Sequence, residues 1–171
     1  MADKTLFFAL WPDTRQRDRM RDFISPLAKL VEGRAVDRRE WHVTLAYIGA
    51  FPEERIDELL EAKQDITMEP FRLRFDRLEF WPRPKIAALV PPTIPPELER
   101  LVEALKGKIF AAGVESLQRV YRPHVTVVRT ARPFEVQRLA QSAMIEWSSY
   151  ELLESISERG TVTYRPIVKD F

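Results

Sequence analysis

Apolar positions along the chain recur with two different periods, one typical of helices and one typical of strands. Apolar residues spaced three and four apart predict amphipathic helices in three segments. A further short helical piece is expected in the C-terminal part of the chain. Pro26 lies inside the first helix, so a kink or break is expected there. The predicted helices cover residues 13–31, 53–63, 97–112 and 134–142.

Short apolar or alternating runs lie between these helices and predict strands. In the run 71–81 the apolar positions are odd-numbered at first and even-numbered later, which indicates a β-bulge near Asp76 and Arg77. Turns at 82–84 and 158–160 predict that the flanking strands form hairpins. The predicted strands cover residues 5–11, 41–48, 71–81, 85–90, 123–129, 144–156 and 161–168.

Two of the predicted strands carry the same tripeptide, His-Val-Thr. It begins at His42 and again at His124, and these are the only histidines in the chain. Side chains two apart on a strand point to the same face, so each copy presents an imidazole beside the hydroxyl of Thr44 or Thr126. If the two strands meet in the fold, two imidazoles and two hydroxyl donors surround one site. Such an arrangement is suited to acid–base attack on a phosphate.

A single strand histidine is more often a hydrogen-bonded structural residue than a catalytic one. Because both histidines are followed by threonine at the same spacing, a shared functional site is favoured. Strict alternation places Ala46 and Ile48 on the face of the first histidine and Tyr47 on the other face. In the second copy, alternation places Arg129 opposite the histidine. Arg129 therefore reaches the site only at a strand end or a bulge.

The order of the elements indicates an internal duplication. A helix, a motif strand, a helix and a hairpin are echoed by a helix, a motif strand, a short helix and a hairpin. We therefore expect an α+β fold that is bilobal and pseudo-duplicated, with two antiparallel sheets facing across a central cleft and helices on the outside. Residues 1–171 are expected to form a single domain of two intertwined lobes, each supplying one motif. The proline-rich stretch 91–96 is the candidate lobe boundary.

Composition and charge are those of an ordinary globular protein, with 45% hydrophobic and 31% charged residues among 171. The net charge is +1, so an anionic partner has to be held by a local cluster such as Arg34, Arg38 and Arg39. The absence of cysteine excludes disulfides and thiol nucleophiles, and two histidines are too few for a typical His-rich zinc site. The apolar run 6–11 is too short for a signal peptide or a membrane span, so a cytoplasmic location without membrane contact is expected.

The two tetrapeptides that begin at His42 and His124 resemble the paired His-x-Thr-x motifs of the 2H phosphoesterase superfamily. Three longer stretches, 6–12, 41–49 and 123–129, narrow this resemblance. Together they are similar to the bacterial and archaeal RNA 2′,3′-cyclic phosphodiesterases, once described as 2′-5′ RNA ligases. The resemblance follows the order of elements over nearly the whole chain and is looser in its tail.

This resemblance implies a metal-independent hydrolase without a cofactor. Water opens a terminal RNA 2′,3′-cyclic phosphate and leaves a 2′-phosphate. The implied partner is RNA with that terminus, or a related cyclic nucleotide, and the chain is expected to be a monomer. The implied site residues are His42 as proton donor, His124 as proton acceptor, Thr44, Thr126 and Arg129 as phosphate contacts, and Phe7 as a contact of the terminal base.

Several alternatives stay open at the level of the sequence. The two motifs are locally equivalent, so the sequence does not decide which histidine is the acid. The same residues could serve another cyclic nucleotide, cleave 2′-5′ linkages or run in reverse as a ligase. From a different class, the chain could be an RNA-end binding module without catalysis, although the intact histidines and threonines of both motifs argue against it.

Overall fold

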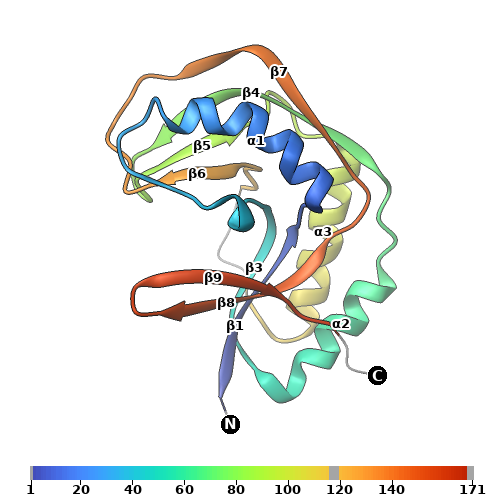
Figure 1. The fold of residues 1–171 in the computed structure, drawn as a ribbon. Coiled ribbons are helices and arrows are strands. Elements are labelled where there is room, and N and C mark those ends of the chain that lie inside the picture. Colours follow the sequence, from blue (N-terminus) through green and yellow to red (C-terminus); the bar gives the residue numbers. More distant parts are fainter. Residues whose placement is uncertain (1, 116–119, 169–171) are drawn as a thin grey trace.

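Two antiparallel sheets form the frame of the protein (Figure 1). The structure is a computed structural model that describes residues 2–115 and 120–168. The four-stranded sheet contains β1 (Asp3–Leu10), β3 (Val43–Pro52), β8 (Glu151–Glu158) and β9 (Thr161–Pro166). The five-stranded sheet contains β2 (Arg34–Ala35), β4 (Phe71–Trp81), β5 (Ile86–Val90), β6 (Val125–Arg129) and β7 (Gln137–Trp147). The strand orders are β3-β1-β8-β9 and β2-β6-β5-β4-β7.

The helices cover these sheets in a crossed arrangement. They are α1 (Thr14–Ala28), α2 (Ile56–Asp65) and α3 (Pro96–Ala111), with short 3-10 turns at Arg38–Glu40 and Glu53–Arg55. Helix α1 follows β1 of the four-stranded sheet, yet it contacts β6 and β7 of the other sheet. Helix α3 follows β5 of the five-stranded sheet, yet it contacts β3. Figure 1 shows α1 beside the five-stranded sheet, and α2 and α3 beside the four-stranded one.

This architecture confirms the predicted α+β fold with two antiparallel sheets and outer helices. Each sheet supplies one His-Val-Thr copy, through β3 in one and β6 in the other. The stretch 91–96 links β5 to α3, and its role as a lobe boundary stays a prediction. None of the helices in the described residues is both long enough and apolar enough to span a membrane.

The apolar faces predicted for the helices are mostly the buried ones. In α3, the buried residues recur at the expected spacing, and they are Leu98, Leu101, Val102, Leu105 and Ile109. Helix α1 begins at a capping box in which Asp13 and Gln16 bond each other's backbone N–H. It runs through Pro26 without a break and ends two residues later. The prediction that it reaches residue 31 was wrong, and Leu30, expected on its buried face, is 67% exposed.

Two predictions for the tail of the chain were wrong. Residues 134–142 are not a helix, because 137–147 form β7, paired with β4. Residues 144–156 are not one strand. They are divided between β7 and β8, which belong to different sheets. Pairing with β4 explains the difference, since a partner strand outweighs local propensity and buries every second residue of β7 at its end, namely Ala143, Ile145 and Trp147.

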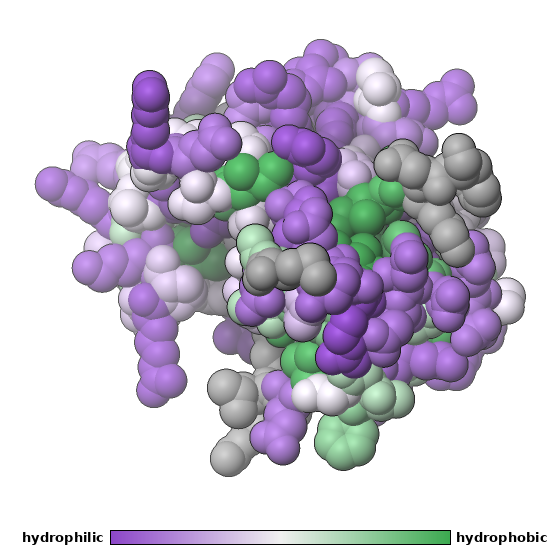
Figure 2. Space-filling view, turned by 90° about the horizontal axis from the view of Figure 1, so that it is seen from below, coloured by the Kyte–Doolittle hydropathy of each residue, from purple (hydrophilic) through white to green (hydrophobic). Residues whose placement is uncertain are grey.

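Hydrophilic side chains cover most of the face seen from below, and apolar side chains show only in separate areas of it (Figure 2). The apolar interior is one large cluster that contains residues of both sheets and all three helices. Two smaller clusters lie on the other faces of the sheets, where the motif side chains also lie. One contains Phe7, Ala9 and Leu153, and the other contains Ile86, Ala88 and Val90.

Candidate functional site

A cavity of about 360 Å³ lies between the two sheets and receives side chains from both. All six residues that the sequence singled out line it. Their proposed roles stay predictions, but their convergence from distant parts of the chain is a property of the fold. The lining residues are Phe7, His42, Thr44, Tyr47, Trp81, Pro84, Ile86, His124, Thr126, Arg129, Ser155 and Tyr164.

His42 is held by two hydrogen bonds that define its tautomer. Its Nδ1 lies 2.7 Å from the backbone oxygen of Glu40, and its Nε2 lies 3.1 Å from the hydroxyl oxygen of Thr44. A carbonyl oxygen only accepts, so Nδ1 carries the proton in the neutral ring. The Nε2 atom is then an acceptor that faces the threonine hydroxyl. The predicted pairing of imidazole and hydroxyl on one strand face is therefore present in the first motif.

His124 repeats the same backbone contact. Its Nδ1 lies 2.9 Å from the backbone oxygen of Arg122, which is again the residue two positions earlier. Nδ1 therefore carries the proton here too, and Nε2 is the nitrogen left to act in the cavity. The side chain of Thr126 lines the same cavity. The two motifs thus present equivalent nitrogens to one space.

β-Bulges determine which neighbouring side chains line the cavity. Pairing of β1 with β3 shifts register twice, so that Phe7 lies opposite Tyr47 and Ala9 lies opposite Thr44. Strict alternation was therefore wrong for β3, because the shifts turn Tyr47 toward the cavity while Ala46 and Ile48 join the main core.

A register shift also acts on the second motif. Ala88 pairs with Thr126, whereas Ala87 pairs with Val128, so β6 is irregular at Val127. Arg129 is the last residue of that strand and lines the cavity. The condition set by the sequence, a strand end or a bulge, is met in both respects. The bulge predicted in β4 is likewise confirmed by a shift between Phe75 and Arg77.

The environment of both imidazoles favours their neutral form. Burial lowers the pKa of His42 to about 4, and the charges of His124, Arg129 and Arg17 act in the same direction. Burial also lowers the pKa of His124, with Arg122 and Arg129 adding to the effect. At neutral pH, both rings of the free protein are therefore mostly uncharged, and a proton on either needs a compensating negative charge.

Aromatic rings enclose His42. Its ring centroid lies 5.2 Å from that of Phe7 and 4.9 Å from that of Tyr164. The backbone N–H of Tyr164 donates to the carboxylate of Glu40 at 3.1 Å, while Arg129 donates to the Tyr164 hydroxyl at 3.1 Å. Through these hydrogen bonds, Tyr164 of β9 contacts Glu40, just before the first motif, and Arg129, at the end of the second motif strand. The sequence did not single out Tyr164, because nothing local shows that β9 lies next to them.

A buried cation supports the backbone before His42. Arg17 of α1 donates to the carbonyls of Arg38 and Trp41, at 2.6 and 3.0 Å. Its guanidinium carbon lies 4.4 Å from the ring centroid of Trp11. Arg17 was also missed, although a sequence signal exists. It lies three residues before Met20 on the predicted apolar face of its helix, where a charged residue needs buried acceptors.

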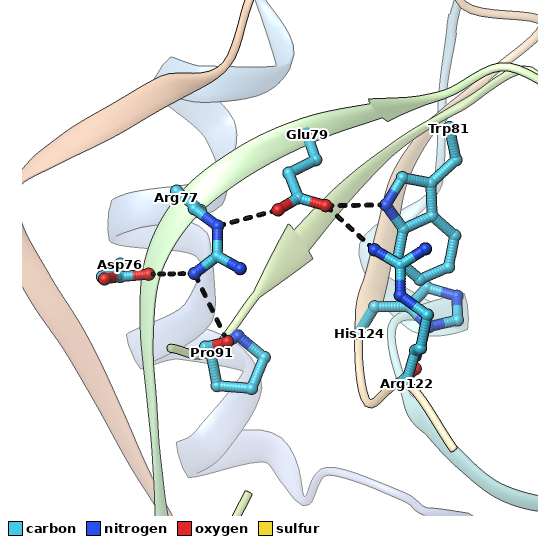
Figure 3. A network of polar contacts seen from close by, with 7 residues as sticks. All are labelled: Asp76, Arg77, Glu79, Trp81, Pro91, Arg122 and His124. Atoms are coloured by element: carbon cyan, nitrogen blue, oxygen red, sulfur yellow. Dashed lines mark hydrogen bonds and ion pairs between the residues drawn. The ribbon is translucent and has the colours of Figure 1, made fainter. Parts of the chain in front are cut away.

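On the other side of the cavity, the side chains of His124, Trp81 and Arg122 lie one against the next (Figure 3). The ring of Trp81 lies 4.3 Å from that of His124, and the guanidinium carbon of Arg122 lies 4.2 Å from the Trp81 ring. Glu79 joins these side chains. It accepts from the Trp81 indole at 3.0 Å, from Arg122 at 3.1 Å and from Arg77 at 2.7 Å.

Although burial opposes it, hydrogen bonds from Trp81 and Arg77 lower the pKa of Glu79, so this carboxylate stays charged. The network was not predicted, but Arg77, Glu79 and Trp81 occupy alternate positions of a predicted strand and therefore share a face. That polar face was the available signal. Because Trp81 touches His124, we infer that Glu79 positions this imidazole.

The described part of the chain contains no group of three or more His, Asp, Glu or Cys side chains that could hold a metal ion. The polar groups that converge in the cavity are imidazoles, hydroxyls and one guanidinium. These groups donate, accept and shuttle protons, and they suit a small anion.

The family described as LigT like Phosphoesterase matches residues 10–90. The RNA 2′,3′-cyclic phosphodiesterase of Archaeoglobus fulgidus is 26% identical over 129 residues, which are 74% of this chain and 73% of that protein. The enzyme of the same name from Aeropyrum pernix is 28% identical over 161 residues, or 87% and 90% of the two chains. The structure of E. coli LigT complexed with 3′-AMP superposes with a TM-score of 0.85 at 23% identity, covering 97% and 96%. That likeness shows a shared fold.

Proposed function

Because the chain belongs to the LigT-like phosphoesterases of the 2H superfamily, we propose that it hydrolyses the terminal 2′,3′-cyclic phosphate of RNA to a 2′-phosphate. One observation carries the proposal. Two histidines, each with Nδ1 donating to the backbone carbonyl two residues earlier, share one cavity with the threonines of both motifs. The names of the relatives support the choice of an RNA 2′,3′-cyclic phosphate.

The proposed reaction needs one proton removed and one delivered on opposite sides of phosphorus. His124 Nε2 takes a proton from water, whose oxygen attacks phosphorus. The bond from phosphorus to the 3′ oxygen breaks, and His42 Nε2 gives its proton to that leaving oxygen. Water and the cyclic ester are thereby converted to a 2′-phosphate and a free 3′-hydroxyl. Before the next turnover, His124 releases the proton that it took from water, and His42 takes up a proton from solvent.

Charge accumulates on the nonbridging oxygens while the water attacks. The hydroxyls of Thr44 and Thr126 are the proposed donors to these oxygens, which their position in the lining of the cavity supports. Arg129 adds a positive charge at the same wall. Each donor belongs to a strand or a strand end, so the donors are held in place before the substrate arrives.

The proton that His42 delivers is supplied when the substrate binds. Burial keeps the pKa of His42 near 4 in the free protein, so this ring is neutral at pH 7. A bound phosphodiester is negatively charged. Its charge stabilises the protonated imidazole, which burial has removed from water. We therefore expect the pKa of His42 to rise when an anion occupies the cavity.

The contacts proposed for the terminal nucleobase are aromatic side chains. Phe7 is only 3% exposed and packs against His42 and Tyr164, whereas Tyr47 on the paired strand is 55% exposed. Phe7 is proposed as the inner contact of the terminal nucleoside, and Tyr47 as the more accessible ring at the same wall.

The direct test is to incubate the protein with an oligoribonucleotide that ends in a 2′,3′-cyclic phosphate, with a chelator present, and to identify the product by phosphorus NMR. A 2′-phosphate is expected, and His42→Ala or His124→Ala should each lose about 100- to 10,000-fold in turnover. A 3′-phosphate or a new 2′-5′ linkage would replace the proposed reaction with another one. RNA binding without any turnover would contradict catalysis altogether.

A further inference from the structure

A second cavity of about 370 Å³ lies against the first. The two share Arg129 and Tyr164 in their linings, so these side chains form the wall between them. Thr161 of β9 and Arg34 of the edge strand β2 also line the second cavity. No residue of the proposed acid–base pair lines it.

The second cavity contains two arginines that lie directly opposite each other. Arg34 on β2 pairs with Arg129 on β6 in an antiparallel register. Cβ atoms of such partners are about 4.5–5.5 Å apart, and like charges in these positions repel. Within residues 2–115 and 120–168, neither arginine has a carboxylate at ion-pairing distance, and the hydrogen bond of Arg129 goes to the neutral hydroxyl of Tyr164. An anion between the two guanidiniums would remove this repulsion.

The carboxylates that also line this cavity are already engaged. Asp37 accepts from the side chain of Arg39 at 3.0 Å and from its backbone N–H at 2.9 Å. The Glu40 carboxylate accepts from the backbone N–H of Tyr164 at 3.1 Å. Arg34 is therefore the cation that remains for a ligand on this side.

On the opposite side of the first cavity, the guanidiniums that line the neighbouring space within residues 2–115 and 120–168 are already ion-paired. A small cavity adjoins the first one there and shares Trp81. Its guanidiniums belong to Arg77 and Arg122, and both are bound to the carboxylate of Glu79. Of the three arginines that precede the first motif, Arg38 and Arg39 are likewise paired, with Asp18 and Asp37. Among the described residues that line these two neighbouring cavities, the arginines of the small cavity are paired with Glu79, whereas Arg34 and Arg129 of the second cavity have no carboxylate partner.

We propose that the second cavity binds the phosphodiester immediately upstream of the terminal nucleotide, with Arg34 as its main contact and Arg129 between the two phosphates. This inference rests on the proposed function, since it concerns the RNA strand that leads to the reacting phosphate. The ligand class is a single-stranded oligoribonucleotide of at least two residues. A cyclic mononucleotide fills only the first cavity.

The test compares three substrates: a 2′,3′-cyclic mononucleotide, a dinucleotide ending in a cyclic phosphate, and the same dinucleotide with an uncharged methylphosphonate between its nucleosides. Arg34→Ala should lower kcat/KM for the charged dinucleotide about tenfold, as expected for one charge-assisted hydrogen bond. Cleavage of the mononucleotide and of the methylphosphonate should stay within about twofold of the unmodified protein. The salt dependence of KM for the charged dinucleotide should become shallower in the variant.

Arg72→Ala is the matched control, because Arg72 is an exposed arginine on β4 of the same sheet and lies away from these cavities. An equal effect of both variants, or an equal effect of Arg34→Ala on all three substrates, would overturn the upstream subsite. So would an undiminished penalty for methylphosphonate in the Arg34→Ala background. If the unmodified protein cleaves none of the cyclic substrates, the proposed function fails, and the subsite fails with it.

Discussion

Burial of His42 couples the stability of the fold to pH. The ordinary pKa of histidine is 6.5, and burial lowers that of His42 to about 4. Between these values the unfolded chain binds a proton that the folded chain does not. The contribution of His42 to the free energy of unfolding is therefore fully present above about pH 6.5 and is lost as pH falls through 4. The complete loss corresponds to about 3 kcal/mol, of which about 2 kcal/mol is lost on going from about pH 7 to about pH 4.5.

Replacing His42 with Gln removes this titration. Urea unfolding of both proteins at about pH 7 and about pH 4.5 gives four free energies of unfolding. We expect the unmodified protein to lose about 2 kcal/mol more than the variant on acidification. His124, whose pKa burial also lowers, and Glu40, whose pKa burial raises, titrate in both proteins, so their contributions largely cancel in the comparison.

A direct measurement is available because the chain has only two histidines. The imidazole signals in an NMR titration can be assigned from the single variants His42→Gln and His124→Gln. The signal of His42 should move with a midpoint near 4 and that of His124 with a midpoint below 6.5. A His42 midpoint near 6.5, or equal losses of stability in both proteins, would refute the link between burial of this ring and its protonation.

Three further predictions concern the site itself. Inorganic phosphate should raise the NMR midpoint of His42, because an anion in the cavity stabilises the imidazolium; an unchanged midpoint at saturating phosphate would show that the anion does not bind beside the ring. Glu79→Gln should lower kcat by up to about 100-fold with little change in KM, and should lower the pKa of His124 further, whereas Glu69→Gln, which alters an exposed carboxylate elsewhere, should do neither. A cyclic substrate with sulfur in place of the 3′ oxygen has a leaving group that needs no proton, so it should restore turnover to His42→Ala but not to His124→Ala, and the reverse result would exchange the two roles.

The sequence predicted those parts of the site that depend on local geometry. His42 and Thr44 are two apart on a strand, so their shared face follows from the strand period alone. The contact of His124 Nδ1 with the carbonyl of Arg122 is equally local, although the sequence analysis did not predict it. Convergence of the two motifs was predicted from their duplication, and the fold brings them into one cavity.

The parts that were missed depend on the register between strands. Tyr47 enters the cavity beside Thr44 because β1 and β3 shift register between Phe8 and Ala9, and such a shift is a property of the pair. The first part of β7, residues 137–142, was read as a short helix, because these residues show no alternation of buried and exposed positions and only pairing with β4 reveals the strand. Tyr164 lies at the site because the terminal hairpin joins the sheet next to β1, and no local pattern specifies that neighbour.

In the proposed reaction, the two motifs alone do not distinguish acid from base, because the motifs are alike. Both Nδ1 atoms bind the carbonyl two residues earlier, so each motif makes the same oriented imidazole. Around His42 lie aromatic rings, whereas beside His124 lie Trp81 and the charge of Arg122. Neither ring holds a proton firmly in the free protein, so the bound phosphate has to attract it. The imidazole nearer to the leaving oxygen then becomes the acid. The orientation of the RNA strand, which the upstream phosphate and Arg34 would determine, therefore selects the roles.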